Sequence, residues 1–99
     1  MTTPTHATIA TFRMDPDKEA AQLQGLRDFI VPSVRETPGF VAGYWTLDRE
    51  SSESVAFILF ESRDAAASLA ENVRLNAPNQ VAVGIELLSI RVSEISASA

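Results

Sequence analysis

Few side chains in this sequence are suited to acid–base chemistry, and they lie far apart along the chain. His6 is the only histidine, and imidazole is the side chain that most readily gains and loses a proton near neutral pH. We interpret His6 either as a proton-transfer residue at the mouth of a cavity or as a solvated residue of a loose N-terminus. The chain has no cysteine, which excludes thiolate nucleophiles, disulfides and cysteine-based zinc or iron–sulfur sites. We expect no metal and no cofactor.

The other two candidates for a catalytic role, besides His6, are the adjacent aromatic residues Tyr44 and Trp45. Neighbouring residues of a strand point to opposite faces of its sheet. One of the two rings therefore faces a cavity, where it could stack on a flat substrate and donate a hydrogen bond, or both rings serve ordinary packing. Arg13 and Arg91 either bind a phenolate or carboxylate, or they occupy a surface position or form an ion pair between subunits.

Composition limits the classes of function that remain. The 99 residues carry a net charge of -5, and 45% of them are hydrophobic. Such a chain has the size of one domain, and its acidity argues against binding to a nucleic acid backbone. No apolar run approaches the roughly 20 residues of a membrane-spanning helix. The first six residues lack the pattern of a secretion signal, so we expect a cytoplasmic protein.

The positions of these candidates depend on alternating strand-like and helix-like segments. Strand-like residues are rich in β-branched and aromatic types, whereas the helical segments repeat apolar residues every three or four positions. The expected strands are 7–13, 40–48, 55–60 and 80–95, and the expected helices are 16–36 and 62–78. Pro32 should kink the end of the first helix. In the last strand the apolar phase slips by one residue between Leu87 and Leu88, which predicts a bulge.

The order β-α-β-β-α-β predicts an α+β ferredoxin-like fold, a four-stranded antiparallel sheet with both helices on one face. We expect a single domain over 1–99, with tails at about 1–6 and 96–99. The third strand places Val55, Phe57 and Leu59 on one face of the sheet and Ala56, Ile58 and Phe60 on the other, so the face that the helices leave uncovered is also apolar. An apolar face of that size predicts a homodimer formed through the open sheet face. The alternative is that these strands are simply hydrophobic, with apolar side chains distributed irregularly over both faces of the sheet.

The segment 31–45, with Pro38-Gly39-Phe40-Val41 at the start of the second strand, and the segment 60–66 resemble the antibiotic biosynthesis monooxygenase-like group of dimeric α/β-barrel proteins. The resemblance covers roughly residues 7–92. It implies two sheets packed back to back and a pocket between each sheet and its helices. The group includes cofactor-free oxygenases of phenolic polycyclic substrates and enzymes that degrade haem. The haem-degrading members use a histidine on the second helix, which this chain lacks.

Three functions remain open. The chain is a small α/β-barrel protein that binds a small aromatic ligand, a cofactor-independent monooxygenase that oxidises a phenolic or quinol substrate with O₂, or a non-catalytic interaction module. The alanine-rich second helix either packs closely on the sheet or leaves volume for a ligand beside Trp45 or Phe60. Asn72 is an amide on this helix, and it completes the ligand-binding candidates Arg13, Phe60 and Arg91.

Overall fold

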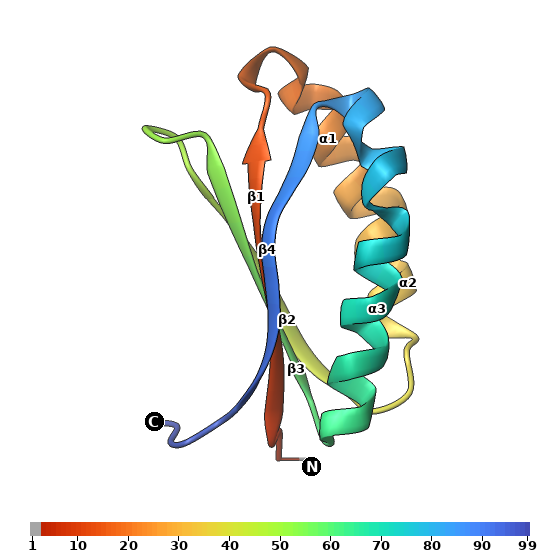
Figure 1. Cartoon of the computed structure of the whole chain (residues 1–99), viewed down its shortest axis with the longest axis vertical. Coiled ribbons are helices and arrows are strands. Elements are labelled where there is room, and N and C mark those ends of the chain that lie inside the picture. Colours follow the sequence, from red (N-terminus) through yellow and green to blue (C-terminus); the bar gives the residue numbers. More distant parts are fainter. Residues whose placement is uncertain (1–2) are drawn as a thin grey trace.

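The computed structural model describes residues 3–99, which form one four-stranded antiparallel sheet with helices on one face (Figure 1). The strands are β1 (His6–Met14), β2 (Phe40–Asp48), β3 (Glu53–Phe60) and β4 (Ile85–Glu94), in the spatial order β2-β3-β1-β4. This is the predicted ferredoxin-like α+β arrangement, and the helical crossovers leave the opposite side of the sheet uncovered. We call that side the open face.

The first crossover is a continuous helical segment of changing pitch. It consists of η1 (Pro16–Lys18), α1 (Glu19–Gly25), the π turn η2 (Leu26–Ile30) and α2 (Val31–Arg35). In the π turn the Val31 N–H donates to the carbonyl of Leu26, five residues back. A proline inside a regular α-helix lacks an N–H and clashes with the carbonyl four residues earlier. The wider turn directly before Pro32 accommodates it where the sequence predicted a kink.

The second crossover runs further than the sequence predicted. Helix α3 (Arg63–Gln80) begins at the predicted cap, where Ser62 Oγ accepts a hydrogen bond from Ala65 N at 3.2 Å. It continues past Pro78 and passes into η3 (Val81–Val83), so the expected start of the last strand at residue 80 is wrong. Gly84 ends the helical segment at a φ of +75°, a conformation that glycine adopts at little cost.

Two β-bulges set which side chains face the helices. On β4, Thr11 pairs with Ser89 and Phe12 with Leu87, so Leu88 is the extra residue, which confirms the predicted bulge. A second register shift, between Phe40 and Ala42, was not foreseen. It places Phe40 on the same face as Trp45, although strict alternation along the strand would put residues 40 and 45 on opposite faces.

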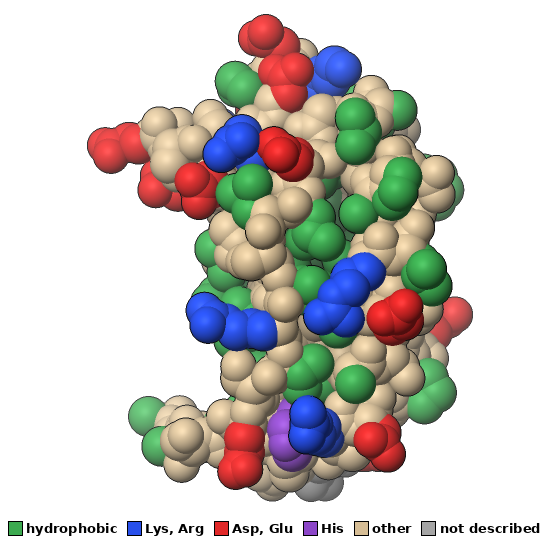
Figure 2. All heavy atoms as spheres, in the orientation of Figure 1, with side chains coloured by type: hydrophobic (Ala, Val, Ile, Leu, Met, Phe, Trp, Pro, Cys, Tyr) green, Lys and Arg blue, Asp and Glu red, His purple; other side chains and the backbone are tan. Residues whose placement is uncertain are grey.

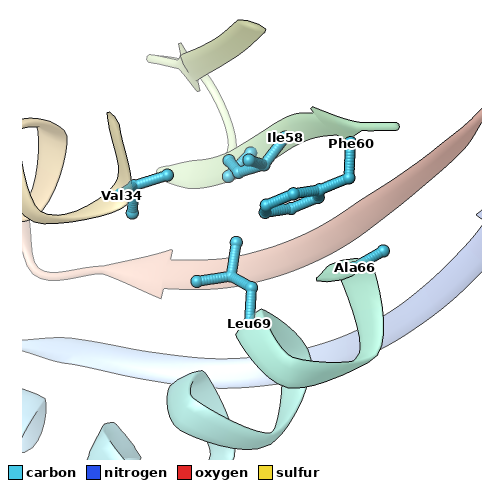
Figure 3. Close-up of a cluster of buried hydrophobic side chains, with 6 residues drawn as sticks. Val34, Ile58, Phe60, Ala66 and Leu69 are labelled. Atoms are coloured by element: carbon cyan, nitrogen blue, oxygen red, sulfur yellow. The ribbon is translucent and has the colours of Figure 1, made fainter. Parts of the chain in front are cut away.

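The core lies between the sheet and the helices. Val34 of α2, Ile58 and Phe60 of β3, and Ala66 and Leu69 of α3 converge there (Figure 3). Apolar burial of this kind is the main stabilising term of a small domain. The side chains of alternate residues on β3 point to the open face, and Phe57 among them is 40% exposed.

The two ends of the chain meet the sheet at the same place. Thr5 N donates to the carbonyl of Phe60 at 2.9 Å, and Ile95 N donates to the carbonyl of Thr5 at 2.8 Å. His6, which we assigned to a tail, is the first residue of β1 and pairs with Phe60 and Glu94. Residues 1 and 2 of the expected tail lie outside the described residues. No helix of residues 3–99 is long and apolar enough to cross a membrane.

Candidate functional site

A cavity of about 620 Å³ lies between the helix-covered face of the sheet and the two helical crossovers. Its floor comes from all four strands, and its walls come from the segment 19–34 and from α3. In the space-filling view, hydrophobic side chains gather between β4 and α3 (Figure 2). The cavity is a consequence of the architecture, because the two helices do not close over the whole sheet.

The floor is apolar, and its hydroxyl groups are engaged within the protein. Thr8 Oγ1 donates to the carbonyl of Ala66 at 2.7 Å, and Ser54 Oγ donates to the carbonyl of Thr46 at 2.6 Å. Phe12, Ile58 and several other strand side chains complete the floor. A ligand on this floor would therefore be held mainly by apolar contact.

Trp45 is the aromatic residue of β2 that lines the cavity, and it packs against the edge of the core. A Cβ built on Gly43 would lie 3.0 Å from Trp45 Cζ3. The six-membered ring thus rests on the bare backbone of Gly43, with Nε1 at the other end of the indole. Nε1 is not fully buried, and within residues 3–99 it makes no hydrogen bond. Its N–H is therefore available to a ligand.

The helical wall formed by residues 19–34 brings one charged group to the cavity. Glu19 is the only charged residue among the lining residues of the described chain. Arg49 Nη1, from the β2–β3 loop, lies 2.7 Å from Glu19 Oε1. Their relative orientation is not that of a hydrogen bond, so this buried oxygen has a charge partner but no donor. The pair ties the hairpin loop to the start of α1 at one end of the cavity.

The structure brings only two of the seven candidate residues into the cavity wall, Trp45 and Asn72. Phe60 lies behind the wall, fully buried, with its ring edge-on to Phe40 at a centroid distance of 6.4 Å. His6 lies on the same face of the sheet as Thr8, beyond the end of the cavity, with Nδ1 2.9 Å from Thr5 Oγ1.

The other three candidates point to the open face. Tyr44 is 64% exposed there and pairs across strands with Phe57. Arg13 forms an ion pair with Glu86 at 3.1 Å, and Arg91 pairs in register with Ile9. These side chains are separated from the cavity by the thickness of the sheet.

Sequence reasoning missed two groups of lining residues. One group lines the cavity from the first crossover and consists of Leu23, Leu26 and Phe29. Asn76 and Gln80 line it on α3, at four-residue intervals from Asn72. The four-residue spacing was visible in the sequence, but the expected helix end at residues 76–78 hid the last member. Among residues 3–99 there is no group of three or more His, Cys, Asp or Glu side chains placed to hold a metal ion.

The architecture defines a class of protein. The chain has the fold of the antibiotic biosynthesis monooxygenase-like proteins, as the resemblance implied. No protein-family model matches the sequence, and no curated protein matches it.

Three solved structures show the likeness. MupZ from Pseudomonas fluorescens has a TM-score of 0.72 at 10% identity, over 95% of this chain and 74% of its own. The monooxygenase ActVA-Orf6 of Streptomyces coelicolor, solved with nanaomycin D, has a TM-score of 0.66 at 13% identity, over 97% of this chain and 89% of its own. A Deinococcus radiodurans protein provisionally described as an antibiotic biosynthesis monooxygenase has a TM-score of 0.65 at 12% identity, over 95% and 93%. At these identities the likeness shows a shared fold.

Proposed function

We propose that the cavity binds a small, flat, largely apolar aromatic ligand. The observation that carries this proposal is the 620 Å³ volume under the helices, which is within the range of small-molecule sites, about 300–1,000 Å³. The apolar floor would bury the ligand's faces, while the free N–H of Trp45 would orient it. Two of the residues predicted for the site, Trp45 and Asn72, support this proposal because both line the cavity.

A second candidate, cofactor-independent oxygenation, is favoured by Trp45 and by the likeness to a monooxygenase. In such a reaction a phenolic or quinol substrate loses a proton, and the electron-rich anion adds O₂ to a ring carbon. Loss of water from the resulting hydroperoxide leaves a ketone or quinone. The chain would contribute a site that excludes water and an N–H donor that stabilises negative charge on the substrate oxygen.

The ligand-binding proposal can be tested with the fluorescence of Trp45, the only tryptophan in the sequence. Titration with an anthraquinone should quench this fluorescence. Trp45→Phe keeps an aromatic six-membered ring but removes the N–H and part of the stacking area, so calorimetry should show affinity for the same ligand reduced by at least two- to tenfold, about the contribution of one neutral hydrogen bond. Tyr44→Phe is the matched control and should leave affinity unchanged, because Tyr44 lies on the open face. Absence of quenching at millimolar ligand would contradict the proposal.

Oxygen consumption separates the two candidates. A panel of hydroquinones and anthrones, supplied without metal or flavin, should be oxidised faster with protein than without it if the chain is an oxygenase. The rate should fall in Trp45→Phe. His6→Ala tests the remaining catalytic candidate, which lies beyond the end of the cavity. Binding without any accelerated oxygen consumption would favour the ligand-binding function alone.

We also propose that a second copy of the chain covers the open face. Tyr44 and Phe57 are neighbours there, 64% and 40% exposed, and aromatic pairs of this kind are enriched in the centres of interfaces. Val55 and Leu59 extend the apolar surface along β3. A homodimer would bury these side chains and leave both cavities free on the outer sides.

A further inference from the structure

One end of the cavity carries a carboxylate. Glu19, in the first turn of α1, lines both the cavity and a second, smaller pocket of about 60 Å³. Arg49, from the loop between β2 and β3, lines the smaller pocket but not the cavity. The hairpin loop and the start of the first crossover lie at the same end of the molecule (Figure 1). Glu19 is therefore positioned between the cavity and the smaller pocket, with Arg49 on its far side.

The ion pair of Glu19 and Arg49 has its negative end towards the cavity, because only Glu19 lines it. Arg49 Nη1 lies 2.7 Å from Glu19 Oε1, but the Arg49 side chain is 73% exposed and that of Glu19 is 36% exposed. Water screens an exposed charge more strongly than a partly buried one. No hydrogen bond within residues 3–99 engages the carboxylate, and its Oε1 is buried without a donor. The cavity therefore contains a negatively charged acceptor that the protein satisfies only in part.

The other polar groups of the cavity do not favour one sign of charge over the other. Within residues 3–99 its lining includes no Lys, Arg, His or Asp and no second Glu. Asn72, Asn76 and Gln80 carry amides, which donate and accept hydrogen bonds alike. The amide of Gln22 already donates to backbone carbonyls. The sign of charge that a ligand can carry here therefore depends on Glu19, and the net charge of -5 on the whole chain attracts the same sign.

Further along the sheet the cavity is aromatic and apolar. Trp45 and Leu47 are two residues apart on β2, a separation of about 7 Å along a strand. Leu47 lines both the cavity and the smaller pocket, as Glu19 does. An aromatic ring stacked at Trp45 would lie on the apolar floor, with the carboxylate beyond it in the direction of the hairpin loop. A ligand that satisfies both ends needs a flat ring and, a short tether away, a positively charged hydrogen-bond donor.

We propose that the cavity selects aromatic amines, ligands whose ring is joined by a short alkyl tether to a protonated amino group, and that Glu19 binds this group. A primary alkylamine carries a positive charge at neutral pH, as the lysine side chain does. Its N–H groups donate to the carboxylate of Glu19 from the cavity side, and such charge-assisted hydrogen bonds are stronger than neutral ones. The inference rests on the proposed ligand-binding function and specifies the ligand class of that site.

Three naphthalene derivatives test the proposal, because they share the ring and the two-carbon tether and differ only in the terminal group. One ends in an ammonium, one in a hydroxyl and one in a carboxylate. Calorimetry at about 0.15 M salt, where distant charges are screened, should show that the ammonium ligand binds about tenfold more tightly than the alcohol. The carboxylate ligand should bind more weakly than the alcohol, because it brings a second negative charge close to Glu19.

Substitutions assign the preference to Glu19. Glu19→Gln removes the charge and keeps the size, so the preference for the ammonium over the alcohol should fall below about threefold. Asp28→Asn is the matched control: Asp28 is exposed on the first crossover and does not line the cavity. This variant changes the net charge by the same amount and should keep the preference. Arg49→Met removes the positive end of the ion pair and should raise the preference, which tests the assignment even if Glu19→Gln fails to fold.

Failure of this inference is distinguishable from failure of the proposed function. Equal affinity for the three ligands would overturn the role of Glu19, and so would a preference that persists in Glu19→Gln or does not rise in Arg49→Met. If none of the three binds but anthraquinone quenches Trp45, the inference fails and the ligand-binding function survives. If neither anthraquinone nor any of the three binds, the ligand-binding function fails, and the inference fails with it.

Discussion

Gln22 shows how one buried polar side chain fixes an end of the cavity. Its Nε2 donates to the carbonyl of Asp15 at 3.0 Å and to that of Val83 at 2.9 Å, and Gly84 O lies 3.4 Å away. These contacts join the start of the first crossover to the end of the second. A Cβ built on Gly84 would lie 2.6 Å from Asp15 Cβ, so the approach of the two segments also requires glycine.

Gln22→Leu should destabilise the protein by about 1–3 kcal/mol, because it removes the hydrogen bonds that Nε2 donates to the carbonyls of Asp15 and Val83. Urea denaturation monitored by Trp45 fluorescence measures this change as a lower midpoint. Gln24→Leu is the matched control on the same helix; Gln24 is exposed, and we expect a change within about 0.5 kcal/mol. Equal effects of the two substitutions would show that the contacts of Gln22 contribute nothing specific.

The candidate residues were predictable by type but not by face. Trp45 and Asn72 reached the cavity, whereas Arg13 and Tyr44 point to the open face. Alternation along a strand says that neighbours differ in face, but not which neighbour faces the helices. On β2 the register shift between Phe40 and Ala42 puts Trp45 on the same face as Phe40, whose ring packs edge-on against Phe60, and simple alternation does not reveal this.

At the scale of the elements, the order of strands and helices followed directly from the sequence pattern, as did the bulge at Leu88. The end of α3 did not. Proline and asparagine at residues 76–78 indicate a helix end locally, yet the helix continues to Gln80. Contacts distant in sequence account for the difference, since Gln22 binds the backbone at Val83 and Gly84 and so fixes where the chain leaves its helical path.

The start of α3 depends instead on a local contact, the hydrogen bond that Ala65 N donates to Ser62 Oγ. Ser62→Ala should lower the free energy of unfolding by about 1 kcal/mol, because it removes the cap. Urea denaturation measures the loss. Ser68→Ala, at an exposed position within α3, should be neutral within about 0.5 kcal/mol, and a loss as large as that of Ser62→Ala would contradict the capping role.

At the scale of the whole molecule, helices cover only one face of the sheet (Figure 1), while the open face carries the exposed aromatic side chains of Tyr44 and Phe57. The proposed dimer explains what covers that face. Its centre would be the pair Tyr44 and Phe57, since both are aromatic, exposed and directly opposite each other on neighbouring strands.

Sedimentation equilibrium at micromolar concentration should therefore give the mass of two chains, and Phe57→Asp should give the mass of one, because it would place a charge within the buried interface. Leu75→Asp is the matched control. Leu75 is 69% exposed on α3, away from the open face, so this variant should remain dimeric. A single-chain mass for the unaltered protein would contradict the proposed dimer.

The hydrogen bond from Ile95 N to the carbonyl of Thr5 brings the first and last strands of the fold together at one edge of the molecule. A short peptide linker could join them, and the polypeptide could then be opened at the exposed turn between β2 and β3. Such a circularly permuted chain would keep every strand pairing and both walls of the cavity. It would also break the covalent link within the β2–β3 hairpin, so that the order in which the sheet assembles during folding could be altered without changing its final architecture.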